Sequence, residues 1–239
     1  MPQTRQFDFE GHAATLICPD TPAAGSPWVF RTEFLYAFNM ADMALLAEGY
    51  HIAYVCCSNE YGEAGAIAVF KRFHDYLVAE EGLSPRASLF GFSRGGLYAC
   101  NYALAHPGDV ACLYLDAPVL DLRSWPAGLG LGCGSPDEWA DCKKRVIHAE
   151  TVEEILAYRG APIDHMPELI ATGIPTLIVA GDADRTVPWG ENGARLAAAY
   201  RAAGAPIDVI LKPGCDHHPH SRDDPAPIVA FVQRESETV

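Results

Sequence analysis

The sequence predicts an α/β fold in which a mainly parallel sheet is covered by helices on both faces. Two observations carry this prediction. Short runs of consecutive apolar residues, typical of strands buried on both faces, alternate with longer segments whose apolar residues recur at helical spacing. Several helical segments also end at a glycine, the residue favoured just beyond a helix C-terminus. Strands that alternate with helices are joined by crossovers and therefore run parallel.

A hairpin is expected at the start of the chain. Phe7 and Phe9 alternate with polar residues, which is the period of a half-exposed strand, and a turn at Gly11 leads into the apolar run 14–18. A loop rich in Pro, Ala and Gly separates this run from the first helix. That helix is expected over 33–48, because a glycine follows it.

Alternating strands and helices make up the rest of the chain, with one interruption. The expected elements are a strand over 51–57, a helix around 66–77, a strand over 87–92, a helix over 94–106, strands over 110–115 and 176–180, a helix over 191–203, a strand over 207–211 and a helix over 228–234. Residues 119–173 break the rhythm with several glycines, two tryptophans and a short helical piece near 152–158. We expect them to form a small cap inserted within a single α/β domain over 1–239.

Composition and charge exclude several classes of protein. The 239 residues carry 31 acidic and 17 basic side chains, a formal net charge of −14, which repels a phosphate backbone and argues against a nucleic-acid partner. No apolar run is long enough to span a membrane, and the N-terminus has no apolar segment typical of a secretory signal. We therefore expect a cytoplasmic protein. The oligomeric state stays open.

The eight cysteines indicate buried thiols more than redox or zinc chemistry. No CxxC pair occurs, and most of the cysteines fall within apolar strand-like or helix-like runs. A disulfide between Cys133 and Cys142 is the alternative, because both lie in the loop-rich segment 119–173. Disulfides are rare in the cytosol, so reduced cysteines are favoured.

A nucleophile is predicted at Ser93. The expected strand 87–92 runs into Gly91-Phe92-Ser93-Arg94-Gly95, and a helix follows. This is the G-x-S-x-G pattern in a strand–turn–helix context, where a tight turn exposes the serine hydroxyl and the small residues let strand and helix approach closely. The helix N-terminus also offers backbone N–H groups to an oxyanion. An ordinary glycine-rich turn is the structural alternative.

A serine hydroxyl needs a general base that is held by a carboxylate, and both follow later strands. The strand at 176–180 ends in a loop that contains Asp182 and Asp184, and we favour Asp184 as the acid. Asp116, which ends an earlier strand, is a second alternative. The base is expected after the last strand, where His217 is favoured over His218, with His220 as a structural residue. Adjacent histidines suit one metal ion poorly, so neither a metal nor a cofactor is expected.

With these residues in place, the chain resembles the α/β-hydrolase superfamily over nearly its whole length. It is most similar to small bacterial serine hydrolases and esterases that carry a Gly-x-Pro-Trp loop, a Gly-x-Ser-Arg-Gly-Gly turn and a His-His-Pro-His-Ser ending. These motifs lie here at 25–31, 91–96 and 217–221. The resemblance implies a triad of Ser93, Asp184 and His217, in agreement with the residue-based prediction.

The oxyanion hole departs from the common superfamily pattern. Many members carry His-Gly after the first buried strand, whereas this chain has Cys18-Pro19-Asp20 and a longer loop. One donor is expected to be the backbone N–H of Arg94, directly after the nucleophile, and the second that of Trp28. The further candidates rest on position alone. We select Arg31, Tyr61 and Trp125 as substrate-binding residues, each of which has an ordinary role in ion pairing or packing as its alternative.

These observations favour an esterase-like hydrolase that cleaves a small ester through an acyl-enzyme on Ser93. A peptidase for small peptides or a lactonase would use the same triad. A non-catalytic binding protein on a hydrolase fold is the alternative from another class, and it is disfavoured because all three triad residues are present.

Overall fold

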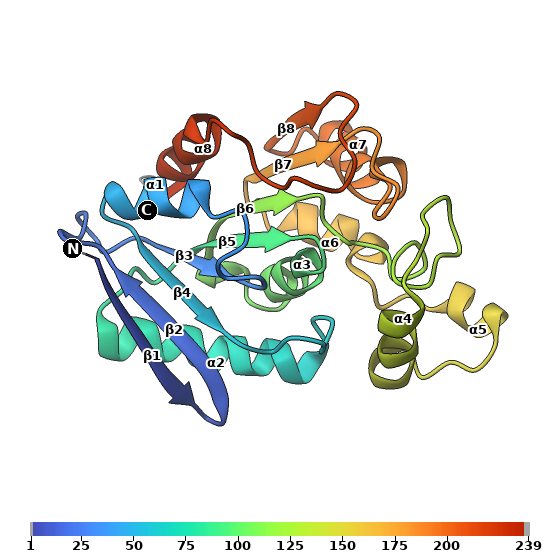
Figure 1. The fold of residues 1–239 in the computed structure, drawn as a ribbon, viewed down its shortest axis with the longest axis horizontal. Coiled ribbons are helices and arrows are strands. Elements are labelled where there is room, and N and C mark those ends of the chain that lie inside the picture. Colours follow the sequence, from blue (N-terminus) through green and yellow to red (C-terminus); the bar gives the residue numbers. More distant parts are fainter. Residues whose placement is uncertain (1, 237–239) are drawn as a thin grey trace.

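The computed structural model describes residues 2–236, which fold around one eight-stranded sheet (Figure 1). The strand order is β1-β2-β4-β3-β5-β6-β7-β8. The pairs β1–β2 and β2–β4 are antiparallel, and every pair from β4–β3 to β7–β8 is parallel. The predicted mainly parallel sheet is therefore confirmed. The strands are β1 (Gln3–Phe9), β2 (His12–Cys18), β3 (Trp28–Arg31), β4 (His51–Val55), β5 (Ala87–Phe92), β6 (Val110–Asp116), β7 (Thr176–Gly181) and β8 (Ile207–Lys212).

Helices cover both faces of the sheet and enclose two cores. Residues of α2, α3 and α7 pack in one core, and residues of α1 and α8 pack in the other. Leu89 and Phe90 are neighbours on β5 but belong to different cores, because successive side chains of a strand point to opposite faces. The helices are α1 (Met40–Ala47), α2 (Ala64–Glu81), α3 (Gly95–Ala105), α4 (Pro136–Cys142), α5 (Val152–Ala157), α6 (Met166–Ala171), α7 (Gly193–Ala203) and α8 (Ala226–Ser236), with short turns η1 (Pro107–Asp109), η2 (Lys143–Ile147), η3 (Pro162–Asp164) and η4 (Trp189–Glu191).

The first helix is shorter than predicted. It begins at Met40, not near residue 33, because Phe34 and Phe38 have φ angles of 53° and 49°, which a right-handed helix does not contain. The guanidinium of Arg31 donates to the carbonyl oxygens of Phe34 and Ala37 at 2.6 and 2.9 Å. These bonds hold the segment in successive turns, so the helical pattern of the sequence is overridden by a buried cation.

The segment before that turn also differs from expectation. The sequence pattern places Trp28–Arg31 in a loop, but these residues form β3, which inserts between β4 and β5 with parallel pairing on both sides. All four residues are buried, so the strand shows no alternation of polar and apolar side chains that would reveal it.

The segment between β6 and β7 contains α4, η2, α5, η3 and α6. Figure 1 shows α4 and α5 beyond the ends toward which the parallel strands point. Arg123 ties two parts of this segment together, because its guanidinium contacts Asp121 at 2.6 Å and Asp164 at 2.7 Å. Catalytic groups of such folds follow the same strand ends, so the insertion lies next to the place where a site is expected.

Two further features limit what the chain contains. Within residues 2–236, every helix is too short or too polar to cross a lipid bilayer. All eight cysteines are free thiols. Cys133 is exposed and Cys142 is buried, so the disulfide alternative between them is not formed.

Candidate active site

Three polar side chains meet where the parallel strands end. Ser93 follows β5, Asp184 follows β7 and His217 follows β8. The carboxyl ends of neighbouring parallel strands lie at one edge of the sheet, which is where α/β proteins gather their functional groups. The structure therefore brings together residues that are far apart in the sequence.

The turn that carries Ser93 is held in an unusual conformation. Its φ angle is 49°, a region that non-glycine residues seldom adopt. Its backbone N–H donates to the carbonyl of Asp116 at 2.9 Å, and its own carbonyl accepts from Val119 at 2.9 Å. A Cβ on Gly96 would lie 2.7 Å from Cβ of Pro118, so this position leaves no room for a side chain. The surroundings thus fix the strained turn and leave Ser93 only partly buried.

A continuous hydrogen-bond relay connects the three side chains. The Oγ atom of Ser93 lies 2.9 Å from Nε2 of His217, and Nδ1 of His217 lies 2.7 Å from Oδ2 of Asp184. His217 and Asp184 are 6% and 7% exposed. An aspartate on Nδ1 fixes the tautomer in which Nε2 carries the lone pair, and Nε2 can then accept the proton of the serine hydroxyl.

The carboxylate of Asp184 is anchored by its own loop. Its Oδ1 atom accepts from the backbone N–H groups of Thr186 and Val187 at 2.9 and 2.8 Å. Its two oxygens therefore have different partners, and only Oδ2 faces the imidazole. Asp182, the rival acid, instead accepts from the backbone N–H of Gly214 at 2.6 Å.

A third aspartate of this region, Asp216, connects the loop that holds Asp184 with the loop that holds His217. Asp216 accepts from the backbone N–H of Arg185 at 2.9 Å and from the N–H of His217 at 2.8 Å, and it forms an ion pair with the Arg185 guanidinium. These hydrogen bonds, led by that of the Arg185 backbone, lower the pKa of Asp216 to about 2. The loops that hold Asp184 and His217 thus remain linked by a carboxylate that is charged near neutral pH.

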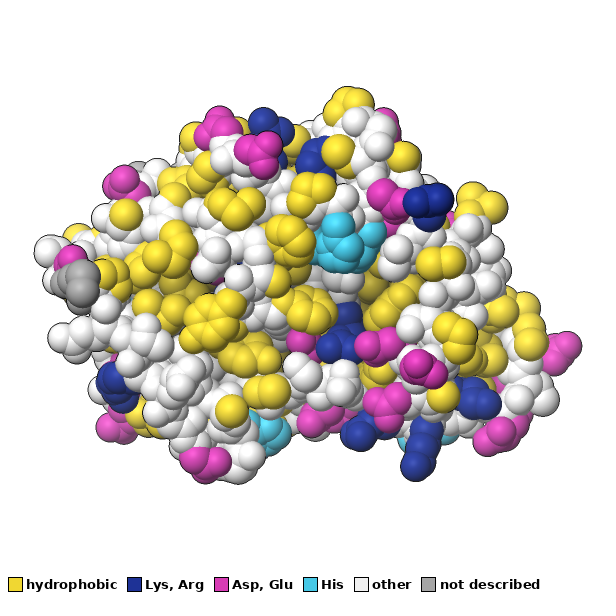
Figure 2. Space-filling view, viewed as in Figure 1, with side chains coloured by type: hydrophobic (Ala, Val, Ile, Leu, Met, Phe, Trp, Pro, Cys, Tyr) yellow, Lys and Arg dark blue, Asp and Glu magenta, His cyan; other side chains and the backbone are white. Residues whose placement is uncertain are grey.

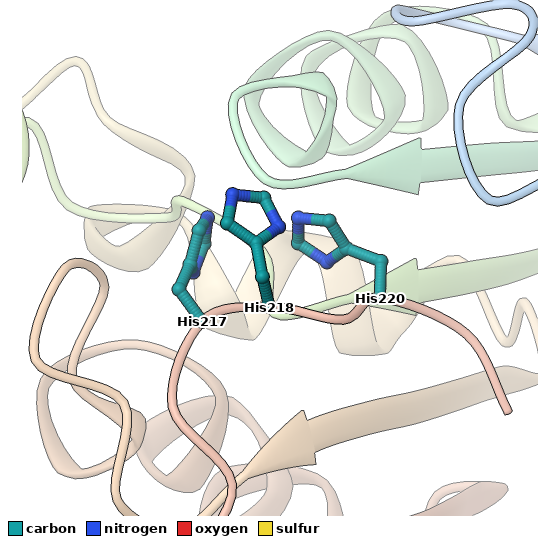
Figure 3. Close-up of side chains that lie close together, drawn as sticks. All are labelled: His217, His218 and His220. Atoms are coloured by element: carbon teal, nitrogen blue, oxygen red, sulfur yellow. The ribbon is translucent and has the colours of Figure 1, made fainter.

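Two more histidines stand beside His217 (Figure 3). His220 is buried, and its Nδ1 lies 2.8 Å from Oδ1 of Asp116, while Oδ2 of the same carboxylate accepts from Tyr114 at 2.6 Å. Asp116 therefore orients His220 and is not the acid of the relay. His218 is exposed and stacks on Phe38 with 5.6 Å between ring centroids. Burial, with the neighbouring imidazoles His220 and His217, lowers the pKa of His218.

A buried ion cluster adjoins the serine. Nη1 of Arg94 donates to Oδ1 of Asn59 at 2.8 Å and to Oε2 of Glu138 at 2.8 Å, and Nη2 lies 3.5 Å from Oε1 of Glu33. Burial alone would lower the pKa of Arg94, but the charges of Glu33 and Glu138 outweigh it and raise that pKa. Burial raises the pKa of Glu33, which Arg94 and a hydrogen bond from Ser58 only partly offset. In Figure 2, histidine side chains face basic and acidic side chains across a hollow.

The structure does not bring Trp28 or Arg31 to this site, which corrects both expectations. Trp28 begins β3, in register with the start of β5, and Ser93 lies beyond the far end of β5. At about 3.3 Å per residue that separation is roughly 20 Å, so the Trp28 N–H is no oxyanion donor. Arg31 is 0% exposed, contacts Asp42 at 3.4 Å and stacks 4.0 Å from the Phe92 ring centroid. It holds the turn after β3 and has no surface that a substrate could reach.

The two remaining candidates have different surroundings. Tyr61 is 2% exposed and donates its hydroxyl to Oε2 of Glu138 at 2.6 Å. It also borders a cavity of about 800 Å³ between α2, α3 and the insertion, whose lining includes Leu97, Asn101 and Tyr158 but neither Ser93 nor His217. Trp125 is 8% exposed and belongs to a hydrophobic core, so its surroundings are those of a packing residue.

Sequence patterns do not reveal that Glu33, Asn59 and Glu138 lie near Ser93 and Arg94. Each lies beside other polar residues in a loop or a short helix, with no spacing that links it to Ser93. Only the tertiary structure brings their side chains to Arg94. Asp116 ends a strand, so its position does give a signal, but its pairing with His220 has no counterpart in the sequence pattern.

Among residues 2–236, two groups of side chains have the composition of a metal site. The first is His217, His218 and His220, whose ligand atoms all lie within 4.8 Å of one another. The second is His74, Asp75 and Asp109. In the second group the ammonium of Lys71 already contacts Asp75 at 2.7 Å and Asp109 at 3.0 Å. An internal cation thus already occupies the space between these two carboxylates, which leaves the histidines as the candidate.

Comparison with known proteins identifies relatives of this fold. The family model for the prolyl oligopeptidase family matches residues 66–237. A puromycin-hydrolyzing peptidase of Mycobacterium tuberculosis superposes with a TM-score of 0.72 at 16% identity, covering 98% of this chain and 38% of that one. Dipeptidyl peptidase 4 of Porphyromonas gingivalis gives 0.69 at 16% identity, with 99% and 35% covered. An Acinetobacter baumannii protein described as a candidate lipase gives 0.66 at 14% identity, with 100% and 93% covered. The chain thus spans little more than a third of the length of the two peptidases.

Proposed function

This chain belongs to the prolyl oligopeptidase family of α/β-hydrolases, and we propose that it is a serine hydrolase that cleaves a small ester through an acyl-enzyme on Ser93. The observation that carries the proposal is the relay from Ser93 Oγ through His217 to Asp184, with distances of 2.9 and 2.7 Å. Both hydrogen bonds are within the range expected for a nucleophile, its base and the group that orients the base.

In the acylation step, Oγ of Ser93 attacks the carbonyl carbon while Nε2 of His217 takes the hydroxyl proton. The bond from that carbon to the leaving oxygen then breaks, and His217 returns the proton to the departing alcohol. In the deacylation step, water attacks the acyl carbon while His217 takes a water proton. The bond from that carbon to Oγ then breaks, the carboxylic acid product leaves, and His217 returns the proton to Ser93. Asp184 stabilises the imidazolium that exists between these transfers.

The oxyanion would be stabilised by two backbone N–H donors, one on each side of the turn that carries Ser93. The N–H of Arg94 is the first donor, because it directly follows Ser93 at the start of α3. For the second we propose Glu33 in place of Trp28. Its backbone nitrogen lies 3.6 Å from the position a Cβ on Gly95 would take, and the N–H of Thr32 before it is already bonded to Phe90. Each such donor contributes about 3–4 kcal/mol to transition-state stabilisation in measured cases.

We propose that the inserted segment 119–173 serves as a cap over this site. Support comes from Glu138 of α4, which pairs with Arg94, the residue next to the nucleophile. Tyr61 donates to the same Glu138 carboxylate. One acidic side chain of the cap therefore contacts two residues, Tyr61 and Arg94, that follow strands of the sheet. We propose a small substrate because this contact closes one flank of the serine.

A small-peptide peptidase is the second candidate, and the family match favours it. The two structural neighbours named as peptidases point the same way, but at 16% identity they support the fold alone. An ester is the less demanding substrate for the same relay, because an alkoxide leaves more readily than an amide anion and a peptide bond therefore depends more on protonation of its leaving nitrogen. The triad chemistry is identical in both cases, so the leaving group must be decided by experiment.

The decisive experiment compares the protein with a Ser93→Ala variant. We expect a fluorophosphonate probe to label Ser93, as identified by peptide mass spectrometry, and we expect the variant to take up none. Hydrolysis of p-nitrophenyl acetate and butyrate should fall by at least 10³-fold in the variant. Wild-type turnover by Ser93→Ala would refute the nucleophile, and the absence of any label would favour a binding protein.

A matched serine control guards against a general effect of removing a hydroxyl. Ser84 lies just before β5, at the opposite end of that strand from Ser93, and its hydroxyl accepts from the backbone N–H of Arg86. Ser84→Ala should therefore keep both the labelling of Ser93 and the rate of ester hydrolysis. Loss of labelling in this variant would mean that the probe reports folding and not the nucleophile.

Ester and peptide cleavage are then compared on one preparation. The ratio of kcat/KM for p-nitrophenyl esters to that for aminoacyl p-nitroanilides measures the preference for the leaving group. Values for matched acyl groups that favour the anilide would replace the ester proposal with the peptidase.

A further inference from the structure

The three histidines of the loop 217–220 lie close together, with their ring planes at steep angles to one another. The ring centroids of His217, His218 and His220 lie 4.7 to 5.0 Å apart, and their planes meet at 69°, 80° and 89°. Figure 3 shows the three rings side by side on one stretch of the chain. We propose that they bind one zinc ion, and that zinc binding inhibits the enzyme reversibly.

The spacing of the rings fits a single ion. With Zn–N bonds of about 2.0–2.1 Å and near-tetrahedral angles, the centroids of imidazoles that share one ion lie about 5 Å apart. The observed centroid distances are close to this value, and the ligand atoms lie within 4.8 Å of one another. A small rotation of the rings would therefore converge three nitrogens on one point, with water as the fourth ligand.

Two of the rings are already held in the tautomer that zinc ligands need. Asp184 accepts from Nδ1 of His217 and Asp116 accepts from Nδ1 of His220, at 2.7 and 2.8 Å. A carboxylate on one ring nitrogen fixes the tautomer and leaves the other nitrogen with its lone pair, as in the carboxylate–histidine–zinc arrangement. His218 is exposed and supplies the third ligand from the solvent side. The two carboxylates also offset the charge of a divalent cation.

The consequence for catalysis follows from the atom that zinc would occupy. Nε2 of His217 is the atom that lies 2.9 Å from Oγ of Ser93. A zinc ion on this lone pair leaves no acceptor for the serine proton, so the base is blocked while the metal is bound. Inhibition rests on the proposed function, whereas zinc binding itself does not.

Zinc binding is therefore measured first, on a variant that lacks the nucleophile, because this measurement does not depend on catalytic activity. Ser93→Ala keeps all three imidazoles, and we expect calorimetry with ZnCl2 to give one site per chain. Cobalt(II) chloride should give the visible absorption of a tetrahedral nitrogen site. Adding His218→Ala should weaken zinc binding by at least about tenfold, whereas adding His165→Ala, a histidine outside the cluster, should leave it unchanged. Equal affinity in the His218→Ala and control proteins would overturn the site.

Inhibition is measured next on the protein with Ser93, with each rate divided by the zinc-free rate of the same variant. We expect ZnCl2 to inhibit ester hydrolysis and EDTA to restore it, and the concentration for half inhibition to rise at least about tenfold in His218→Ala. Cys133→Ser tests the exposed thiol as a competing ligand and should not change the inhibition. Zinc binding without measurable hydrolysis would refute the proposed function alone, and hydrolysis with no zinc binding at millimolar ZnCl2 would refute this inference alone.

Discussion

Nη1 of Arg94 lies 2.8 Å from Oε2 of Glu138 and thereby joins the residue after Ser93 to helix α4 of the insertion. Arg94 is 7% exposed, so the partners that surround it must offset the cost of burying its charge. Of its partners Glu33, Asn59 and Glu138, the last comes from the inserted segment and the other two from loops of the sheet. Hydrogen bonds to charged groups contribute about 1.5–3 kcal/mol, and less where one partner is as exposed as Glu138, so this pair helps to hold α4 against the site.

We predict that Glu138→Gln loosens α4 and alters substrate binding more than chemistry. The amide keeps the size of the side chain but removes the charge that faces Arg94. KM for p-nitrophenyl butyrate should change on the order of tenfold, with kcat changed less, and amide hydrogen exchange over 137–142 should accelerate. Asp137→Asn is the matched control, because Asp137 is exposed on the same helix. Equal exchange rates in both variants and the parent would show that the Arg94–Glu138 contact does not hold α4 in place.

A second prediction separates the two aspartates that follow β7. Asp184→Asn places an amide where Nδ1 of His217 needs an acceptor, so the imidazole is no longer held in the productive tautomer. We expect kcat to fall about 10⁴-fold with a small change in KM. Asp182→Asn keeps the oxygen that accepts from Gly214 and should cost far less. If Asp182→Asn were the more damaging substitution, the acid would have been misassigned.

Much of the sheet could be predicted because its strands are local patterns. The runs at 87–92, 110–115 and 176–180 are short, apolar and followed by turn or helix signals, and each forms a strand at nearly those bounds. The same strand ends indicated the positions of Ser93 and Asp184. Local sequence was enough here, because each pattern specifies its own element.

The rest depends on contacts between distant residues. The turns after β3 exist because buried Arg31 donates to the carbonyl oxygens of Phe34 and Ala37. No local sequence pattern predicts an aromatic residue with a positive φ angle such as that of Phe34. Glu33 and Glu138 approach Arg94 only after the sheet and the insertion have folded. Such pairs carry no periodicity, so a single sequence does not reveal them.

A third prediction concerns the close packing behind Ser93. Gly96→Ala would normally stabilise a helix by about 1 kcal/mol. Here the new methyl would lie 2.7 Å from Cβ of Pro118 and 2.9 Å from the carbonyl oxygen of Val119, which offer little room to move. Overpacking of this kind costs about 1–3 kcal/mol, so we expect a lower free energy of unfolding in urea. Gly108→Ala, with open space around it, should change that free energy by less than about 0.5 kcal/mol.

The last prediction concerns the acid titration of Asp216, the carboxylate that links the loops of Asp184 and His217. Its pKa is about 2 in the folded protein, below the ordinary value of 3.8. A lowered pKa means that the charged form stabilises the fold. That contribution is complete above the unfolded value and is lost as the pH falls through the folded one, so the loops should remain linked at about pH 4. Carbon-13 NMR of the side-chain carboxyl gives the midpoint directly.

The partners of Asp216 determine how far that midpoint can move. Arg185→Gln removes the guanidinium but keeps the backbone N–H groups of residues 185 and 217, which are the leading causes of the shift. The midpoint should therefore rise only part of the way toward 3.8. A full return to the ordinary value would show that the ion pair, and not the backbone, holds the carboxylate. In that case raising the salt concentration should also move the wild-type midpoint, because an exposed ion pair is screened by salt and the backbone hydrogen bonds are much less affected.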